Sequence, residues 1–218
     1  MRDILAQAIT RHQAGQLQAA ARSYQKVLKA APLHAEARHL FGILRFQQGK
    51  HEEAVKLLLG ALREKPDYTE ALYNLANVYS HLGRYAEAVT SYERALAIDG
   101  NLVEAHINRG SALMQLSRDA EALESFDRAL AIQPEMAAVH NNRAAALRML
   151  KRFDEAIQSY DRALAIKPDL IETQISKGDA FSEWGRYAEA LAEYEKVLAI
   201  QPGNQEALRG RADAALNL

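Results

Sequence analysis

Apolar residues recur three and four positions apart along most of the chain, which is the spacing of amphipathic helices. Between residues 69 and 98 they form two runs, separated by Gly83 and Arg84. The apolar positions of these runs are Leu72, Leu75, Ala76 and Tyr79, then Ala88, Tyr92, Ala95 and Leu96. Glycine often ends a helix in the left-handed conformation. We therefore predict one helix over about 69–82 and a second over about 85–98.

The same pair of runs returns every 34 residues. Proline stands at positions 32, 66, 134, 168 and 202, where it stops a helix, and Gly100 takes the remaining place in that series. Three columns share the period: an alanine column (Ala20, Ala54, Ala88, Ala122, Ala156, Ala190), a leucine column (Leu28, Leu62, Leu96, Leu130, Leu164, Leu198) and a large apolar column (Tyr24, Leu58, Tyr92, Phe126, Tyr160, Tyr194). The alanine column indicates a close crossing of two helices, with no room for a larger side chain.

Turn residues follow the same period. Glycine stands between the two helices of four units, at positions 15, 49, 83 and 185. Ser117 and Lys151 replace it in two units, where the left-handed conformation is less favourable. Six copies of one helix–turn–helix pattern predict a stack of units whose stability adds unit by unit.

A helix–turn–helix of this length, with small, aromatic and proline markers, resembles the tetratricopeptide repeat (TPR). The residues that carry the resemblance include those of the run above and, in the next unit, Gly110, Leu113, Ala122, Phe126, Ala129 and Pro134. The resemblance implies an all-α fold, a right-handed superhelical α-solenoid forming a single domain over 1–218. Its units would be 1–34, 35–68, 69–102, 103–136, 137–170 and 171–204, followed by a capping helix over 205–218.

Arrays of this family bind, and the resemblance implies a concave groove, lined by the first helices, that holds an extended peptide. We expect a protein–protein interaction scaffold rather than an enzyme, with a protein or peptide as its partner. The alternative is that the chain is the N-terminal, substrate-recruiting region of a larger enzyme such as a glycosyltransferase. The segments 106–110 and 127–134 look like the arrays of bacterial O-linked N-acetylglucosamine transferases.

Asparagines stand at one exposed column of the first helices, namely Asn74, Asn108 and Asn142. The resemblance implies a ladder that grips peptide backbone, because an amide donates and accepts hydrogen bonds at once. Neighbours that would extend this groove are Asn77, Ser111, Asn141, Tyr73 and Ile107. The other interpretation is that asparagine merely solvates an exposed helix face. Replacing Asn108 and Asn142 by alanine should weaken peptide binding without lowering stability.

A basic column lies beside the asparagines, at Arg109, Arg143, Lys177 and Arg211. It either attracts an acidic or phosphorylated segment or pairs internally with carboxylates such as Asp127, Asp161 or Glu195. A third column, Glu36, Glu70, Glu104, Glu172 and Glu206, opens the first helices, where the helix dipole favours carboxylates. It would make one rim of the groove acidic.

Leu57 and Leu59 stand where the other second helices carry polar residues. Together they would form an outer apolar patch, and exposed patches mark interfaces. Self-association as a homo-oligomer is one interpretation. Local repacking against the first unit is the other.

Composition excludes several classes of function. The 27 Lys and Arg against 28 Asp and Glu give no basic excess, so we expect no nucleic-acid partner. There is no cysteine, the seven histidines are scattered, and the phosphate-binding and catalytic signatures are absent, so we expect no metal, cofactor or catalytic residue. No stretch has the length and apolarity of a signal peptide or a membrane span, and we expect a cytoplasmic protein without membrane insertion.

Overall fold

The computed structural model describes residues 2–218, and every regular element within that range is an α-helix. The helices are α1 (Arg2–Gln13), α2 (Leu17–Ala30), α3 (Ala35–Gln47), α4 (His51–Glu64), α5 (Thr69–His81), α6 (Tyr85–Ile98), α7 (Val103–Gln115), α8 (Asp119–Ile132), α9 (Ala137–Met149), α10 (Phe153–Ile166), α11 (Ile171–Glu183), α12 (Tyr187–Ile200) and α13 (Gln205–Leu216). The predicted helix pair over 69–82 and 85–98 is confirmed to within one residue. The all-α repeat fold is confirmed.

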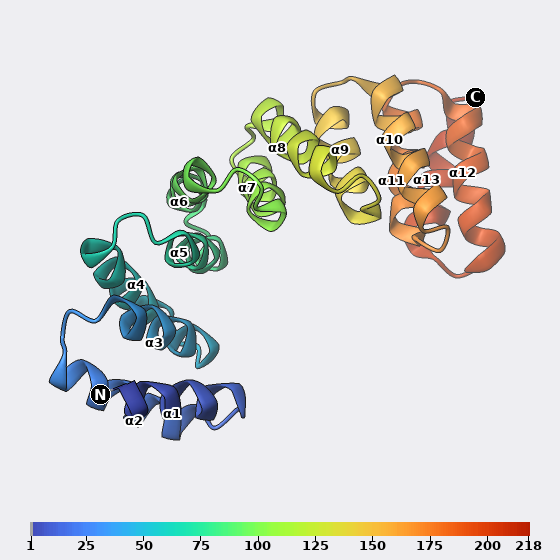
Figure 1. The fold of residues 1–218 in the computed structure, drawn as a ribbon. Helices are drawn as coiled ribbons and strands as arrows, with labels where there is room; N and C mark the ends of the chain where they lie inside the picture. The colour runs from blue at the N-terminus through green and yellow to red at the C-terminus, as the bar shows by residue number, and fades with distance from the viewer. Residues whose placement is uncertain (1) are drawn as a thin grey trace. The chain divides into compact units, whose positions relative to one another are not determined.

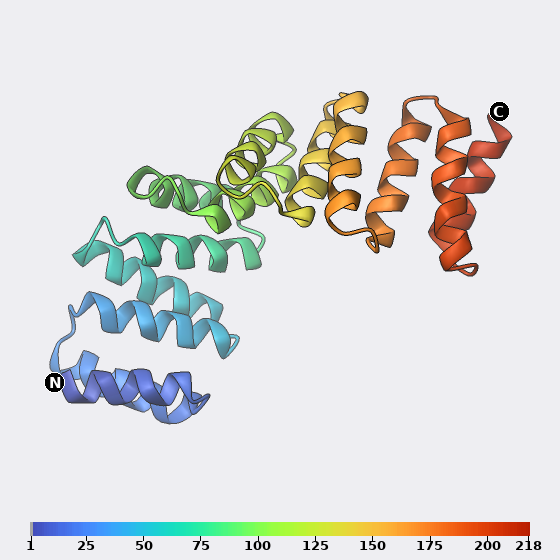
Figure 2. The same ribbon diagram turned by 45° about the vertical axis from the view of Figure 1, so that its right-hand side comes forward.

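The helices form two compact units, residues 1–112 and 113–218, and the division falls inside α7. In each unit consecutive helices lie side by side (Figures 1 and 2). Odd-numbered helices also touch one another, as α1 with α3, α3 with α5, α9 with α11, and α11 with α13. Within a unit the first helices of neighbouring repeats therefore share one face, as expected of a helical-repeat array.

The turns inside the repeats have the left-handed backbone that the sequence predicts. Gly83 has a φ of 71°, and the turn glycines of three other repeats lie close to it. Ser117 and Lys151, which replace glycine, have φ of 56° and 59°. The period thus fixes the backbone of the turn even where a side chain makes it costly.

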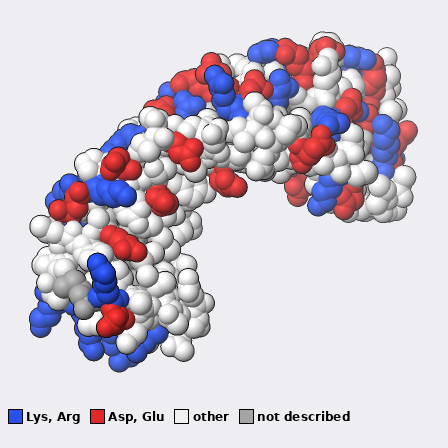
Figure 3. All heavy atoms as spheres, viewed as in Figure 1, with Lys and Arg blue, Asp and Glu red and all other residues white. Residues whose placement is uncertain are grey.

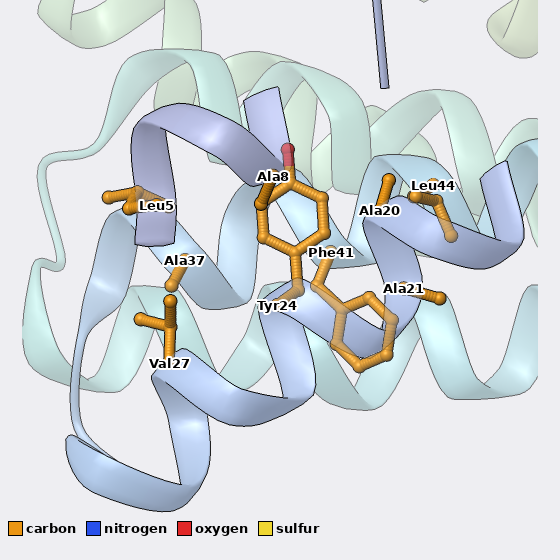
Figure 4. Close-up of a cluster of buried hydrophobic side chains, with 9 residues drawn as sticks. All are labelled: Leu5, Ala8, Ala20, Ala21, Tyr24, Val27, Ala37, Phe41 and Leu44. Atoms are coloured by element: carbon orange, nitrogen blue, oxygen red, sulfur yellow. The ribbon is translucent and has the colours of Figure 1, made fainter. Parts of the chain in front are cut away.

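The repeated small and large apolar residues form the core. All six alanines of the alanine column are fully buried, and the large apolar column is at most 1% exposed. In the first repeats, Tyr24 packs beside Phe41 with ring centroids 5.9 Å apart, among side chains of α1, α2 and α3 (Figure 4). Because α3 belongs to the second repeat, neighbouring repeats share one apolar cluster. A small side chain is also required where α3 packs against α4, because a Cβ at Gly42 would lie 2.9 Å from the side chain of Leu58.

Leu57 and Leu59 do not form a joint surface. Leu57 is half-buried and packs against the N-terminal apolar cluster, whereas Leu59 is 38% exposed. Two positions along a helix turn the side chain by about 200°, so the two leucines point to different sides. Repacking against the first repeat accounts for Leu57, and self-association through Leu59 stays a prediction.

Candidate peptide-binding face

The first helices of residues 1–112 carry two groups of hydrogen-bonded polar side chains. On α5, Asn74 is half-buried, and its Nδ2 lies 2.9 Å from Nε2 of His39 on α3. Nδ1 of His39 lies 2.9 Å from the hydroxyl of Tyr68, just before α5. Asn74 is therefore held in place from the preceding repeat by a buried imidazole.

His39 is 5% exposed, and this burial lowers the pKa of its imidazole, with the nearby carboxylate of Glu70 opposing the shift. The neutral ring has one donor and one acceptor nitrogen. Since Nδ2 of Asn74 can only donate, Nε2 of His39 accepts, and the proton on Nδ1 points to Tyr68. This tautomer is assigned from the hydrogen bonds.

A second group of hydrogen bonds joins α5, α6 and α7. Oδ1 of Asn77 accepts from the hydroxyl of Tyr92 at 2.5 Å and from Nδ2 of Asn108 at 3.2 Å. Nδ2 of Asn108 also lies 3.4 Å from the hydroxyl of Tyr73. Burial raises the pKa of Tyr92 to about 12, so its hydroxyl stays a donor at every physiological pH. Two of the predicted asparagines, Asn74 and Asn108, are thus oriented by internal partners.

A cleft of about 370 Å³ opens beside Tyr73, at the N-terminal ends of α5 and α7. Its lining combines apolar and acidic side chains: Thr69, Glu70, Tyr73, Asp99, Leu102, Glu104 and Ala105. Glu70 and Glu104 belong to the predicted acidic column and are exposed. The acidic rim therefore borders a recess with an aromatic wall, and not a plain helix surface.

The remaining groove candidates are distributed over both units. Ile107 is half-buried, and Ser111 is exposed, its hydroxyl donating to the carbonyl of Ile107 at 3.1 Å. In the second unit, Oδ1 of Asn141 accepts from the hydroxyl of Thr173 at 3.0 Å, and Asn142 is half-buried. In the first unit, Asn74 therefore belongs to the hydrogen-bonded group of His39, whereas Asn77, Asn108 and Tyr73 belong to the second group.

The basic column makes internal ion pairs at the 34-residue period. Nη2 of Arg109 lies 2.9 Å from Glu93, Nε of Arg143 lies 2.6 Å from Asp127, and Nζ of Lys177 lies 2.6 Å from Asp161. In each pair the cation follows its carboxylate by sixteen residues. Two of the suggested internal partners, Asp127 and Asp161, are confirmed. Recruitment of an acidic ligand by Arg109 or Arg143 stays a prediction, and these pairs compete with it.

Two participants, His39 and Tyr68, were not predicted from the sequence. His39 occupies the same column as Tyr73 and Ile107, both groove candidates, and that register was the available signal. The residue type changes from repeat to repeat, so the column does not stand out as a pattern.

Other kinds of site find no support in the part of the chain that the structure describes. Residues 2–218 contain no group of three or more His, Asp or Glu side chains placed to hold a metal ion. None of their helices combines the length and the apolarity needed to cross a bilayer.

Comparison with known proteins identifies the repeat. Two family models, each described as tetratricopeptide repeat, match the chain, one over 5–68 and 39–102 and the other over 101–168 and 135–202. A search of curated protein sequences finds no match.

Three solved structures illustrate the likeness in fold. YrrB, described as a TPR protein with an unusual peptide-binding site, superposes with a TM-score of 0.80 at 21% identity, covering 88% of this chain and 99% of its own. A tetratricopeptide repeat protein from Parabacteroides merdae gives 0.77 at 22% identity, covering 99% and 90%. MamA from Desulfovibrio magneticus gives 0.73 at 20% identity, covering 78% and 97%. With the family matches and the repeating helix pairs, these findings show that the chain belongs to the tetratricopeptide-repeat family, whose fold is that of a protein–protein interaction scaffold.

Proposed function

We propose that the first-helix face of residues 1–112 binds an extended segment of a partner protein, without catalysing a reaction on it. The observation that carries this proposal is the pair Asn74 and Asn108, half-buried amides held in fixed orientations by His39, Tyr73 and Asn77. Groups oriented before binding lose little conformational freedom when the ligand arrives.

The hydrogen bonds of Asn74 and Asn108 described above are made by Nδ2. Oδ1 of each amide is then the group that accepts a backbone N–H of the ligand. Contacts of this kind read the backbone and not the side chain, so they suit an extended segment of varied sequence.

The cleft beside Tyr73 supplies the place for one ligand side chain. Tyr73 and Leu102 offer apolar surface, and Glu70, Asp99 and Glu104 surround it with negative charge. A few polar groups around an apolar recess are typical of ligand sites. A long basic side chain matches this recess best, with its methylene groups on Tyr73 and its cation at the rim.

The second unit is proposed to carry peptide-binding residues of its own, with Asn142 in the register of Asn74 and Asn108, and Asn141 in the register of Tyr73 and Ile107. Asn141 has the same kind of internal partner as Asn77, namely a side chain of the next repeat. YrrB is described as having a peptide-binding site, which supports the class of ligand without identifying it.

The test uses extended peptides selected from a random display library on the intact chain. Affinity of the best peptide is then measured by fluorescence anisotropy for the wild type, Asn108→Ala and Tyr73→Phe. We expect each substitution to weaken binding about five- to twentyfold, since each removes one or two hydrogen bonds of the face. Thr90→Ala is the control: this exposed hydroxyl on α6 bonds only to its own helix, at the carbonyl of Ala86. Selected peptides that bind all four proteins equally would overturn the proposal.

A further inference from the structure

The helix α2 differs in charge from every other second helix. At position 19 of the repeat register it has Ala19, where the others have Glu53, Glu87, Glu121, Glu155 and Glu189. At the next acidic position it has Gln25, where four of the others have Glu93, Asp127, Asp161 and Glu195. With both carboxylates replaced, α2 contains no acidic residue at all, and its charged side chains are Arg22, Lys26 and Lys29.

These three cations lie on one exposed side of α2, spaced four and three residues apart. Among the residues that the structure describes, none of the three takes part in an ion pair. Figure 3 shows Lys and Arg side chains gathered at the α1 and α2 end of the first unit, with few carboxylates between them. The positive charge on this side is therefore largely uncompensated.

A cleft of about 580 Å³ runs between α2 and the corner that joins α3 to α4. Its lining residues are Leu17, Gln18, Ala21, Arg22 and Gln25 on one side and Arg45, Gln48 and Lys50 on the other. Three cations and three amides line it, and no carboxylate does. The cleft shares no lining residue with the candidate peptide-binding face.

One carboxylate nearby is shared by two of the cations. Glu53, half exposed, lies 3.0 Å from Nε of Arg45 and 3.5 Å from Nζ of Lys50. Nη1 of Arg45 donates to Oε1 of Gln48 at 2.8 Å, which fixes the guanidinium at the edge of the cleft. Arg22, Arg45 and Lys50 thus outnumber their neighbouring acid by two positive charges.

We propose that this cleft, named the α2 cleft, binds a carboxylate-rich segment of a partner protein. The guanidinium of an arginine can donate two parallel hydrogen bonds to a carboxylate, and Lys50 adds a point charge from the opposite wall. The amides of Gln18, Gln25 and Gln48 are suited to the peptide groups between the acidic side chains. Charge complementarity therefore identifies the ligand as an acidic peptide.

The lining favours a peptide over the other anionic partners. Single-stranded nucleic acids stack their bases on aromatic side chains, and the α2 cleft has none. Membrane-surface helices present large apolar side chains to the lipid, whereas here Ala21 is buried and Leu17 is half-buried against the core.

The experiment measures binding of a fluorescein-labelled alternating Gly-Glu peptide to the intact chain by anisotropy, at low and physiological salt. We expect saturable binding that weakens as salt rises, and no binding of the matching Gly-Lys peptide. The variant Arg22→Gln/Lys50→Gln should weaken binding about tenfold or more, because it removes two contacting cations. The control Lys26→Gln/Lys29→Gln removes the same charge from α2 outside the cleft and should weaken binding only about twofold.

Each outcome decides the proposal. The proposal is overturned if the Gly-Glu peptide does not bind. It is also overturned if the two double variants lose affinity equally, because the peptide then responds to the diffuse positive field of the first unit and not to the α2 cleft. Tighter binding of a Gly-phosphoserine peptide, of oligothymidylate or of phosphatidylserine vesicles, lost in Arg22→Gln/Lys50→Gln, would overturn the choice of carboxylate peptide. The Asn108→Ala variant should bind the Gly-Glu peptide as the wild type does, which separates this site from the candidate peptide-binding face.

Discussion

The hydroxyl of Tyr92 donates to Oδ1 of Asn77 at 2.5 Å and so ties the second helix of its repeat to the first. The second unit repeats the arrangement, because the hydroxyl of Tyr194 donates to Oδ1 of Asp179 at 2.8 Å, again fifteen residues earlier. The rings of both tyrosines fill the repeat core, while their hydroxyls reach the polar side of the first helix. Each of these tyrosines of the large apolar column thus contributes its ring to the packed core and its hydroxyl to the side of the first helix where ligands are expected to bind.

Replacing Tyr92 by phenylalanine should test that connection. The ring and its packing stay, but Asn77 loses a buried donor, so we expect the free energy of unfolding to fall by about 1–2 kcal/mol. Urea denaturation followed by circular dichroism measures it. Tyr85→Phe, at a half-buried position on the same helix, is the control and should change stability by less than about 0.5 kcal/mol. Equal losses in the two variants would contradict the role of the Asn77 hydrogen bond.

The alanine column predicts that the helix crossings have no room for a larger side chain. Ala122 is fully buried at a helix crossing, so Ala122→Leu should overpack it and lower the free energy of unfolding by about 1–3 kcal/mol. The exposed Ala120 lies on the same helix, and Ala120→Leu should be nearly neutral. Thermal melts of both variants compare them directly. An unchanged melting temperature for Ala122→Leu would mean that the crossing accommodates a leucine side chain, which would contradict the prediction.

The period accounts for most of the fold that could be predicted. It placed the helix ends, the left-handed turns and the buried columns, because these depend on one repeat and are copied along the chain. It also offered internal pairing of the basic column with carboxylates such as Asp127 and Asp161 as one interpretation, and the structure pairs these two with Arg143 and Lys177.

The candidate site was predicted less completely. Asn74 and Asn108 stand out as a column, but their partners His39 and Tyr73 belong to a column of changing residue type. Which of them meet depends on how neighbouring first helices pack, and that is not visible in one repeat. The same hydrogen bonds change one expectation: Asn108→Ala should now cost about 1 kcal/mol of stability besides weakening peptide binding.

Lys177 offers a test of the internal ion pairs. It is 8% exposed and lies 2.9 Å from Glu193, itself 5% exposed, as well as beside Asp161. Burial alone would lower its pKa, but hydrogen bonds to Asp161 and Glu193 outweigh burial and raise it, so Lys177 stays charged. Lys177→Met removes a cation that balances the negative charge of the buried Glu193 carboxylate, and we expect the free energy of unfolding to fall by about 3 kcal/mol.

The controls for Lys177 separate charge from packing. Lys196 also lies 2.9 Å from Glu193 but is mostly exposed, so Lys196→Met should cost less than about 1 kcal/mol. The double variant Lys177→Met/Glu193→Gln removes the buried carboxylate and should recover part of the loss seen in Lys177→Met. Urea denaturation of the three variants gives the comparison. Failure of the double variant to recover any stability would assign the loss to packing.

His39 makes the stability of the first unit depend on pH. Burial lowers the pKa of His39 in the folded chain below its ordinary value of 6.5, so on acidification the unfolded chain takes up this proton first. The contribution of neutral His39 is therefore complete above pH 6.5 and is lost as the pH falls from there toward the folded pKa. Protonation also removes the acceptor that Nδ2 of Asn74 uses. Urea denaturation at about pH 7.5 and about pH 5.5 should show lower stability at the acid value, and His39→Gln should reduce that difference. A difference that persists in full in His39→Gln would assign the pH dependence to other groups.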